Sequence, residues 1–229
     1  MKKYHKIQSI FKREKEPPRN FIIGDYSRSE FLFLKDNLWD YREKVNGTCV
    51  RVIYDPYIGV EFRGKTDNAQ LPTKLVTALI KMFTREKLES TFTAPVCLYG
   101  EGYGPGIEGG GKYRTDPSFV LFDIKIDEWW LTTGNCLDLS YKLGIDFVPW
   151  IGQGTLEEAV TYVKEGFNSK WGEFPAEGLV LKPVTQLFAR DGSRIITKIK
   201  HKDFKIDWNK ELSDLLSCKI DMDRLLFKE

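Results

Sequence analysis

Short runs of β-branched and aromatic residues recur along the 229-residue chain, and most are bounded by Gly, Pro, Asp or Asn. This pattern is typical of β-strands, because such side chains pack on a pleated surface and the bounding residues favour turns. The predicted strands are residues 48–54, 59–63, 96–99, 119–126, 178–181 and 194–199. Residues 1–20 are charged and are expected to form an arm or an early strand followed by a loop.

Three other segments have the character of helices, namely residues 71–87, 156–166 and 210–226. The first places Leu75 and Leu79 at helical spacing. The second follows Thr155, a candidate N-cap with Glu158 three residues later. Residues 100–111 are too rich in glycine for a helix or a regular strand. Strands outnumber helices and do not alternate with them, so the pattern predicts an α+β fold with largely antiparallel sheets.

Composition narrows the class of protein. Lysines and arginines number 35 and acidic residues 33, for a net charge of +2, so a nucleic-acid surface would have to come from local clustering. The four cysteines form no C-x-x-C pair, which argues against a zinc site and a disulfide framework. No apolar run has transmembrane length, and the basic N-terminus leads into no signal-like segment. We expect a monomeric, cytoplasmic protein without a membrane partner.

The first candidate for chemistry is Lys44, in the segment Glu43-Lys44-Val45-Asn46-Gly47. Asn-Gly favours positive φ and a sharp turn, which would bring the Lys44 amine to the mouth of a sheet. Taken alone, the segment is better explained as an ordinary hairpin with a surface lysine. Arg63 and Lys65 would add two cations nearby if their strands pair, and arginine can grip a phosphate with two hydrogen bonds. A basic strand end is the alternative.

Two further segments could bind a nucleoside. Glu101 lies between glycines, where the backbone can approach a ligand closely and the carboxylate could accept a hydrogen bond from a ribose hydroxyl. A flexible loop with a solvated glutamate explains it about as well. Phe122 lies on the opposite face of its strand from Phe119 and could stack on a base. A position in the hydrophobic core is the alternative, above all for Phe119.

The last group combines Glu177, at the start of a strand, with Lys198 and Lys200 on a later one. A carboxylate suits a hard cation such as Mg²⁺. Lysines two apart on a strand point to the same side and repel unless an anion, such as a triphosphate, lies between them. A solvated edge strand protected by lysines is the alternative. A basic surface for nucleic-acid phosphates would comprise Arg194, Lys198, Lys200, Lys202 and Lys205.

In order and spacing these segments resemble the successive motifs of the covalent nucleotidyltransferases, which comprise ATP-dependent DNA ligases, RNA ligases and mRNA capping enzymes. The series is Lys-x-Asn-Gly, Arg-Gly-Lys-Thr, Gly-Glu-Gly, Phe-Asp, Glu-Gly-Leu-Val-Leu-Lys and Lys-x-Lys. The chain is most similar to the bacteriophage RNA ligase 2-like branch. That choice rests on Glu43 before the lysine, the Gly-Pro-Gly-Ile-Glu run at 104–108 and the Lys-x-Lys-x-x-x-Phe ending at 198–204. The resemblance covers residues 4–204.

The resemblance implies an ATP-grasp-like nucleotidyltransferase domain of two antiparallel sheets flanked by helices, with ATP between them. Lys44 would form lysyl-AMP, and nearby cations would favour its uncharged, nucleophilic form. Glu177 would bind Mg²⁺, with Mn²⁺ as an alternative, and Lys198 and Lys200 would hold the phosphates. The other nucleotide-binding residues would be Glu43 for adenine, largely through its backbone, Asn46 and Gly47 beside the lysine, Arg63 and Lys182 for phosphates, Glu101 for ribose and Phe122 for adenine.

The implied activity is an ATP-dependent RNA ligase that joins 5′-phosphate and 3′-hydroxyl ends through an adenylylated 5′ end, as in phage-like RNA repair. Two departures stand out: Asn46 replaces the Asp of many ligases, and only 25 residues follow Phe204, too few for an OB-fold. We therefore expect an adenylyltransferase domain at 1–204 and a short helical tail at 205–229. A minimal DNA ligase that seals nicks and a non-catalytic nucleotide- or RNA-binding module remain open alternatives.

Overall fold

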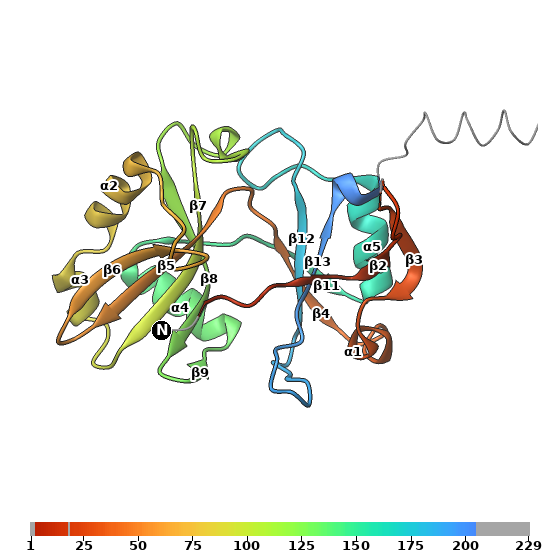
Figure 1. Ribbon diagram of the computed structural model, residues 1–229, viewed down its shortest axis with the longest axis horizontal. Helices are drawn as coiled ribbons and strands as arrows, with labels where there is room; N and C mark the ends of the chain where they lie inside the picture. Colours follow the sequence, from red (N-terminus) through yellow and green to blue (C-terminus); the bar gives the residue numbers. More distant parts are fainter. Residues whose placement is uncertain (1–2, 18, 205–229) are drawn as a thin grey trace, which may run out of the picture.

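The computed structural model describes residues 3–17 and 19–204 and contains two large β-sheets (Figure 1). The five-stranded sheet has the order β1 (Gln8–Ser9), β13 (Thr197–Lys200), β12 (Gly178–Pro183), β4 (Trp39–Glu43), β11 (Trp150–Gly154). The six-stranded sheet has the order β10 (Asp146–Phe147), β8 (Ser118–Ile126), β7 (Val96–Tyr103), β5 (Thr48–Asp55), β6 (Gly59–Gly64), with β9 (Trp129–Trp130) also beside β8. Each sheet is antiparallel except for one pair, β1 with β13 and β10 with β8. The predicted α+β class is confirmed.

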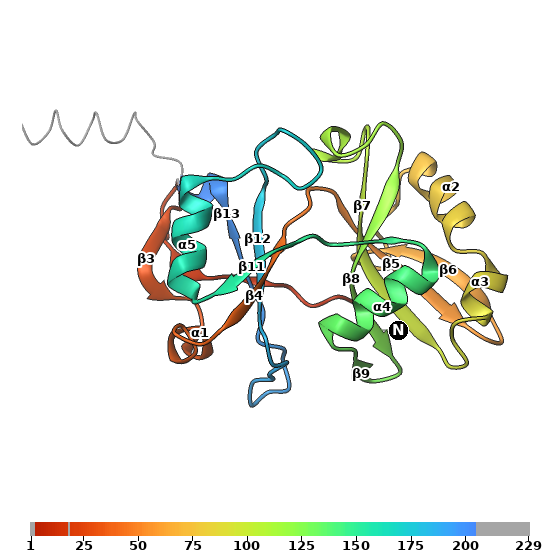
Figure 2. The ribbon, with the colours of Figure 1, turned by 180° about the vertical axis from the view of Figure 1, so that it is seen from behind.

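Helices cover the outer face of each sheet, so each sheet has a core of its own (Figures 1 and 2). Beside the six-stranded sheet lie α2 (Thr73–Met82), α3 (Arg85–Glu89) and α4 (Thr133–Leu143). Beside the five-stranded sheet lie α1 (Ser29–Phe33), α5 (Leu156–Glu165) and the ribbon of β2 (Phe11–Arg13) and β3 (Phe21–Tyr26). Two 3₁₀ turns complete the described part, η1 (Gly110–Lys112) and η2 (His201–Phe204). None of the helices described is long and apolar enough to cross a membrane.

The helix predicted at 71–87 is two helices. Helix α2 ends at Met82, and the Thr84 side chain then caps α3 by accepting a hydrogen bond from the Lys87 backbone. A threonine whose side chain can bind backbone N–H groups is more favourable at a helix N-cap than inside a helix, which explains the break at Thr84. The capping box of Thr155 and Glu158 is confirmed at the start of α5. Helices α1 and α4 had not been expected, and the helix predicted at 210–226 lies outside the described residues.

Strand β7 continues through Gly100–Tyr103, so the expectation that residues 100–111 form no regular strand is wrong for the first four of them. The sheet packs so closely there that a side chain at Gly100 would clash with Phe119, and one at Gly102 would come within 2.5 Å of Leu75. These glycines therefore preserve the strand instead of breaking it. The strand predicted at 194–199 begins only at Thr197.

The described chain passes between the two large sheets three times. The N-terminal arm leads from Tyr4, which packs against the six-stranded sheet, to β1 in the five-stranded sheet. Residues 44–47 lead from β4 to β5, and residues 148–149 lead from β10 back to β11. The last two crossings begin and end side by side, because Glu43, the last residue of β4, donates its N–H to the Pro149 carbonyl at 3.0 Å. Figures 1 and 2 show the three crossings between the sheets.

Candidate active site

Lys44 directly follows β4, at the start of a crossover between the sheets. The segment is therefore neither an ordinary hairpin nor the positive-φ turn that Asn-Gly predicted, since neither Asn46 nor Gly47 has a positive φ. Gly47 serves close packing, because a side chain there would clash with the carbonyl oxygen of Gly102 on β7. The crossover thus holds Lys44 at the boundary between the two sheets.

The carboxylate of Glu177 bridges two lysines. Lys44 Nζ lies 2.6 Å from Glu177 Oε2, and Lys200 Nζ lies 2.6 Å from Glu177 Oε1. The backbone fixes this group, since the Lys44 N–H donates to the Gly178 carbonyl at 2.9 Å. Burial opposes ionisation of Glu177, but the two lysines outweigh it and keep its pKa below the usual value for glutamate. Lys44 is therefore paired with a carboxylate and is not surrounded by cations alone.

A cleft of about 390 Å³ opens beside Lys44, with walls from both sheets and from the N-terminal arm. The six-stranded sheet contributes Glu101 and Phe122, and the five-stranded sheet contributes Lys44, Val180 and Lys198. Such a volume suits a nucleotide-sized ligand. The structure thus places the expected nucleophile, ribose-binding residue and stacking residue on one cleft.

Two side chains in this cleft have shifted pKa values. Burial raises the pKa of Glu101 to about 7, against the opposing attraction of Lys44. Burial and the nearby charges of Lys44 and Lys200 lower the pKa of Lys198. A ligand anion would relieve the repulsion around Lys198, so this part of the cleft favours phosphate.

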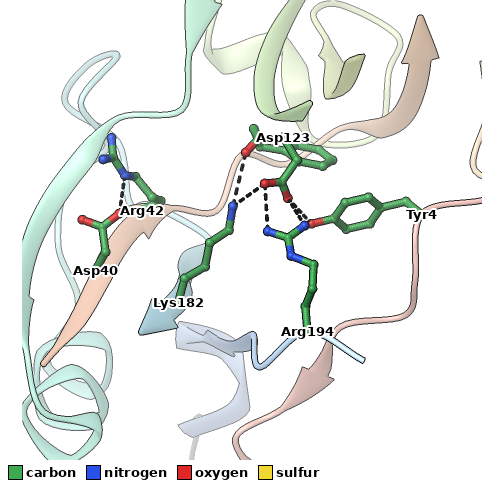
Figure 3. A network of polar contacts seen from close by, with 7 residues as sticks. Tyr4, Asp40, Arg42, Asp123, Lys182 and Arg194 are labelled. Carbon is green, nitrogen blue, oxygen red and sulfur yellow. Dashed lines mark hydrogen bonds and ion pairs between the residues drawn. The ribbon is translucent and has the colours of Figure 1, made fainter. Parts of the chain in front are cut away.

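Asp123 closes the other part of the cleft with a buried polar network (Figure 3). It accepts from Arg194 Nη1 and Nη2 at 3.0 and 2.9 Å and from Lys182 Nζ at 2.7 Å, and Tyr4 donates a further hydrogen bond to it. Lys182 also donates to the backbone carbonyl of Phe122 at 3.3 Å. Burial opposes ionisation of Asp123, but Lys182 and Arg194 outweigh it and depress its pKa.

This network changes two expectations. Arg194 was expected on a surface that binds nucleic-acid phosphates, yet its side chain is only 5% exposed and is paired with Asp123. Lys182 lines the cleft, but at the end next to Phe122 and Asp123 instead of beside Lys44. An acidic residue inside an apolar strand was the sequence signal for this network, because a buried carboxylate needs cationic partners.

Strand β6, which carries Arg63, pairs with β5 as expected. However, Arg63 forms an ion pair with Glu61 and does not line the cleft, whereas Lys65 does. Lys202 is exposed on η2, and Lys205 lies outside the described residues.

Glu43 and Asn46 lie on either side of Lys44 in the sequence, and two loops hold them in place. The Glu43 carboxylate accepts hydrogen bonds from Ser169 Oγ at 2.6 Å and from the Lys170 N–H at 2.9 Å. The Asn46 N–H donates to Tyr113 Oη at 3.0 Å. Glu43 still lines the cleft, but Asn46 does not. The sequence offered no recognisable signal for Tyr113.

The carboxylates present suit a cation that arrives with a nucleotide. Among the described residues no group of three His, Cys, Asp or Glu side chains could hold a metal ion. Mg²⁺ is commonly bound by one or two carboxylates together with substrate phosphates. Glu177 lies near enough to Glu101 that its charge helps to raise the pKa of Glu101, and these two carboxylates match that requirement.

Comparison with solved structures shows a shared fold with Naegleria gruberi RNA ligase. The structure with PPi has a TM-score of 0.62 and 19% identity, and the match covers 76% of this chain and 52% of that one. A variant with AMP and Mn has a TM-score of 0.62 and 18% identity, with coverage of 77% and 53%. A variant with ATP and Mn has a TM-score of 0.63 and 18% identity, with coverage of 86% and 61%. This chain thus spans between half and two thirds of the length of those proteins.

The family assignment comes from the sequence itself. A model of the RNA ligase family matches residues 39–200, which run from β4 to β13 and include the cleft residues of both sheets. The match covers most of the chain. The chain therefore belongs to the RNA ligase family.

Proposed function

We propose that this chain is an ATP-dependent RNA ligase in which Lys44 accepts AMP, and that residues 1–204 form its adenylyltransferase unit. The observation that carries the proposal is the place of the Lys44 amine, 2.6 Å from Glu177 and on a cleft that also presents Phe122 and Glu101. In this arrangement Phe122 stacks on adenine, Glu101 accepts a hydrogen bond from a ribose hydroxyl, and the α-phosphate faces Lys44. Membership of the RNA ligase family supports RNA ends as the substrate.

The reaction has three transfers. The uncharged Lys44 amine attacks the α-phosphorus of ATP; a P–N bond forms, pyrophosphate leaves and the nitrogen loses its extra proton. An oxygen of a 5′-phosphate then attacks that phosphorus; the P–N bond breaks, the Lys44 nitrogen takes up a proton and leaves as the free amine, and a 5′–5′ anhydride forms. Finally a 3′-hydroxyl attacks the 5′-phosphorus, loses its proton and releases AMP. Positioning and charge neutralisation are the work of the protein in each step.

The residues around Lys44 supply that neutralisation. Lys198 lines the cleft, and Lys200 is held beside Lys44 by Glu177. Both can face the phosphates once the nucleotide enters. A divalent cation, which Glu177 and Glu101 suit, would supply further positive charge to the phosphates. The presence of ATP, AMP and Mn in structures of the Naegleria protein supports this choice of ligands.

Mass spectrometry of the intact protein tests the proposal. After incubation with ATP and Mg²⁺ we expect an AMP-sized adduct that maps to Lys44 and is absent from Lys44→Ala. Lys65→Ala, which removes another lysine of the cleft, is the matched control and should retain the adduct. An adduct that persists in Lys44→Ala, or none in the native protein, would refute the proposal.

Sealing assays test the preference for RNA. We expect 5′-phosphate ends to be joined to a ribonucleotide 3′-end faster than to a deoxyribonucleotide 3′-end, because only the 2′-hydroxyl distinguishes them. Equal rates with both ends would favour a DNA nick-sealing enzyme, and binding of both without sealing would favour a non-catalytic module.

A further inference from the structure

One loop, residues 104–113, lies close against Asn46, two residues after Lys44. Its N–H donates to Tyr113 Oη at 3.0 Å. A side chain at Gly109 would clash with Asn46 Nδ2, and one at Gly110 would lie 3.2 Å from the Asn46 carbonyl oxygen. The glycines of residues 104–113 therefore let this loop close around the crossover.

The loop itself is firmly held. Residues Gly104 and Ile107 form a bridge at its base, where Gly104 has a φ of +131° that favours glycine. The buried Tyr113 ring packs against Trp171 and Phe174, with ring centroids 5.4 and 5.2 Å away. Burial raises the pKa of Tyr113 to about 12, so its hydroxyl is uncharged at neutral pH.

The aromatic contacts join this loop to the one that holds the other side of the nucleophile. Trp171 directly follows Ser169 and Lys170, which bind the Glu43 carboxylate. Lys44 is thus flanked by two anchored residues, Glu43 before it and Asn46 after it. A misplacement of about 1 Å can lower a reaction rate roughly a hundredfold, so the anchoring of Glu43 and Asn46 on either side of Lys44 bears directly on the rate.

We propose that Tyr113, together with the Gly109–Gly110 turn, is a positioning element for Lys44: it fixes the crossover so that the amine faces the α-phosphate. The proposal rests on the proposed role of Lys44 as nucleophile. Tyr113 is a positioning residue, because its hydroxyl contacts the backbone of Asn46 and does not line the cleft. The Asn46 side chain accordingly serves packing and not nucleotide binding.

Tyr113→Phe removes the hydroxyl and leaves the aromatic ring. We expect the rate of adduct formation at saturating ATP to fall about tenfold to a hundredfold, with the KM for ATP changed less than about twofold. Tyr103→Phe is the matched control: its ring lies in the same aromatic cluster, but its hydroxyl donates to Asp146 at 3.3 Å, away from the crossover. An unchanged rate in Tyr113→Phe, or an equal loss in Tyr103→Phe, would overturn the proposal.

Amide hydrogen exchange separates this proposal from the proposed function. Tyr113→Phe takes away the acceptor of the Asn46 N–H, so exchange in peptides covering 44–48 should accelerate, and it should not do so in Tyr103→Phe. If the native protein forms no adduct, the proposed function fails, but the exchange measurement still decides whether Tyr113 holds the crossover at residues 44–47. Unchanged exchange in Tyr113→Phe would show that Tyr113 does not hold the crossover.

A double-mutant cycle covers the possibility that Tyr113→Phe disturbs folding. Gly109 has a φ of −86°, so alanine is allowed there and its only fault is the clash with the Asn46 side chain. We expect Gly109→Ala to slow adduct formation about tenfold in the native background and less than twofold in an Asn46→Ala background. An equal loss in both backgrounds would contradict the packing role of Asn46.

Discussion

Two carboxylates, each with two cationic partners, mark the two ends of the cleft. Asp123 lines one end, here called closed, and Glu177 lies beside Lys44 at the other, here called open. At the closed end Asp123, in the six-stranded sheet, binds Lys182 and Arg194 from the other side of the cleft and so ties the sheets together. At the open end Glu177 binds Lys44 and Lys200, which follow or belong to strands of its own five-stranded sheet. Only the first arrangement joins the two halves of the molecule.

The two ends also differ in access to water. The Asp123 side chain is 2% exposed, whereas the Glu177 side chain is 14% exposed and its two lysine partners are 19% and 23% exposed. The buried Asp123 carboxylate already accepts hydrogen bonds from three side chains, so binding a new partner would not stabilise it further. Glu177 and its lysines can exchange partners with an entering phosphate. Similar groups of one carboxylate and two cations thus join the sheets at one end and, in the proposed function, take part in the chemistry at the other.

The largest expected effect is the loss of stability in Asp123→Ala. Removing the carboxylate leaves the charges of Lys182 and Arg194 buried without a partner, which typically costs about 3–5 kcal/mol. Urea unfolding of the variant should show a free energy of unfolding lower by that amount. Glu177→Ala, measured alongside, should lose no more than about 1 kcal/mol, because its partners reach solvent. Equal losses would remove the distinction between the ends.

Next comes the loss of rate in Glu177→Gln. The amide keeps the shape of the side chain but gives up the charge that pairs Lys44 with Lys200, so we expect adduct formation to fall at least about a hundredfold. Thermal unfolding should shift little. A variant that is fast but unstable would reverse the roles assigned to the two carboxylates.

The effect of pH on nucleotide binding should be smaller, about tenfold. Because burial raises the pKa of Glu101 to about 7, the carboxylate that we propose accepts a hydrogen bond from the ribose becomes protonated as pH falls from 8 to 6. Affinity for a non-hydrolysable ATP analogue, measured by calorimetry, should therefore fall over that range. Glu101→Gln should flatten the profile, and a native profile that is already flat would contradict the assigned role.

The same shift has the opposite sign for stability. The folded protein favours protonated Glu101, so its contribution to the free energy of unfolding is greatest below the ordinary glutamate pKa of 4.5 and declines as pH rises towards 7. Comparing the native protein with Glu101→Gln by thermal unfolding at several pH values isolates this contribution.

The smallest difference concerns two cations that lie close together in the sequence, Arg63 and Lys65. Lys65 lines the cleft, whereas Arg63 is occupied by Glu61 outside it. We expect Lys65→Ala to raise the KM for ATP about threefold to fivefold and Arg63→Ala to change it less than twofold, since one exposed charge contributes at most about 1 kcal/mol. The reverse order in steady-state kinetics would restore the role that the sequence predicted for Arg63.

The sequence predicted much of the strand pattern because alternating and apolar runs are local properties. It also predicted that Lys44, Glu101 and Phe122 come together, and they line one cleft with Glu177 bound to Lys44 beside it, since these residues recur in a family order. It could not predict that residues 44–47 cross between sheets, because that depends on which strands pair. The continuation of β7 through Gly100 was missed for a similar reason. Glycine is needed there because a side chain would clash with Phe119, and no local pattern reveals that contact.

Polar pairings were the least predictable part of the site. Arg194 and Lys198 are both basic residues near one strand, yet the first is buried against Asp123 and the second lines the cleft. Their difference arises from the partner that folding brings to each. Tyr113 was missed because its hydroxyl meets a backbone group far away in the sequence, and backbone acceptors and donors leave no trace in residue types.

The three crossings between the sheets have a thermodynamic consequence. Each sheet has its own core and its own covering helices, and two such layers could in principle melt one after the other. Here neither sheet can lose its strands without releasing a crossing that the other sheet needs, as the pairing of Glu43 with Pro149 illustrates. The described part of the chain should therefore absorb heat in a single cooperative transition, with the calorimetric enthalpy equal to the van't Hoff enthalpy.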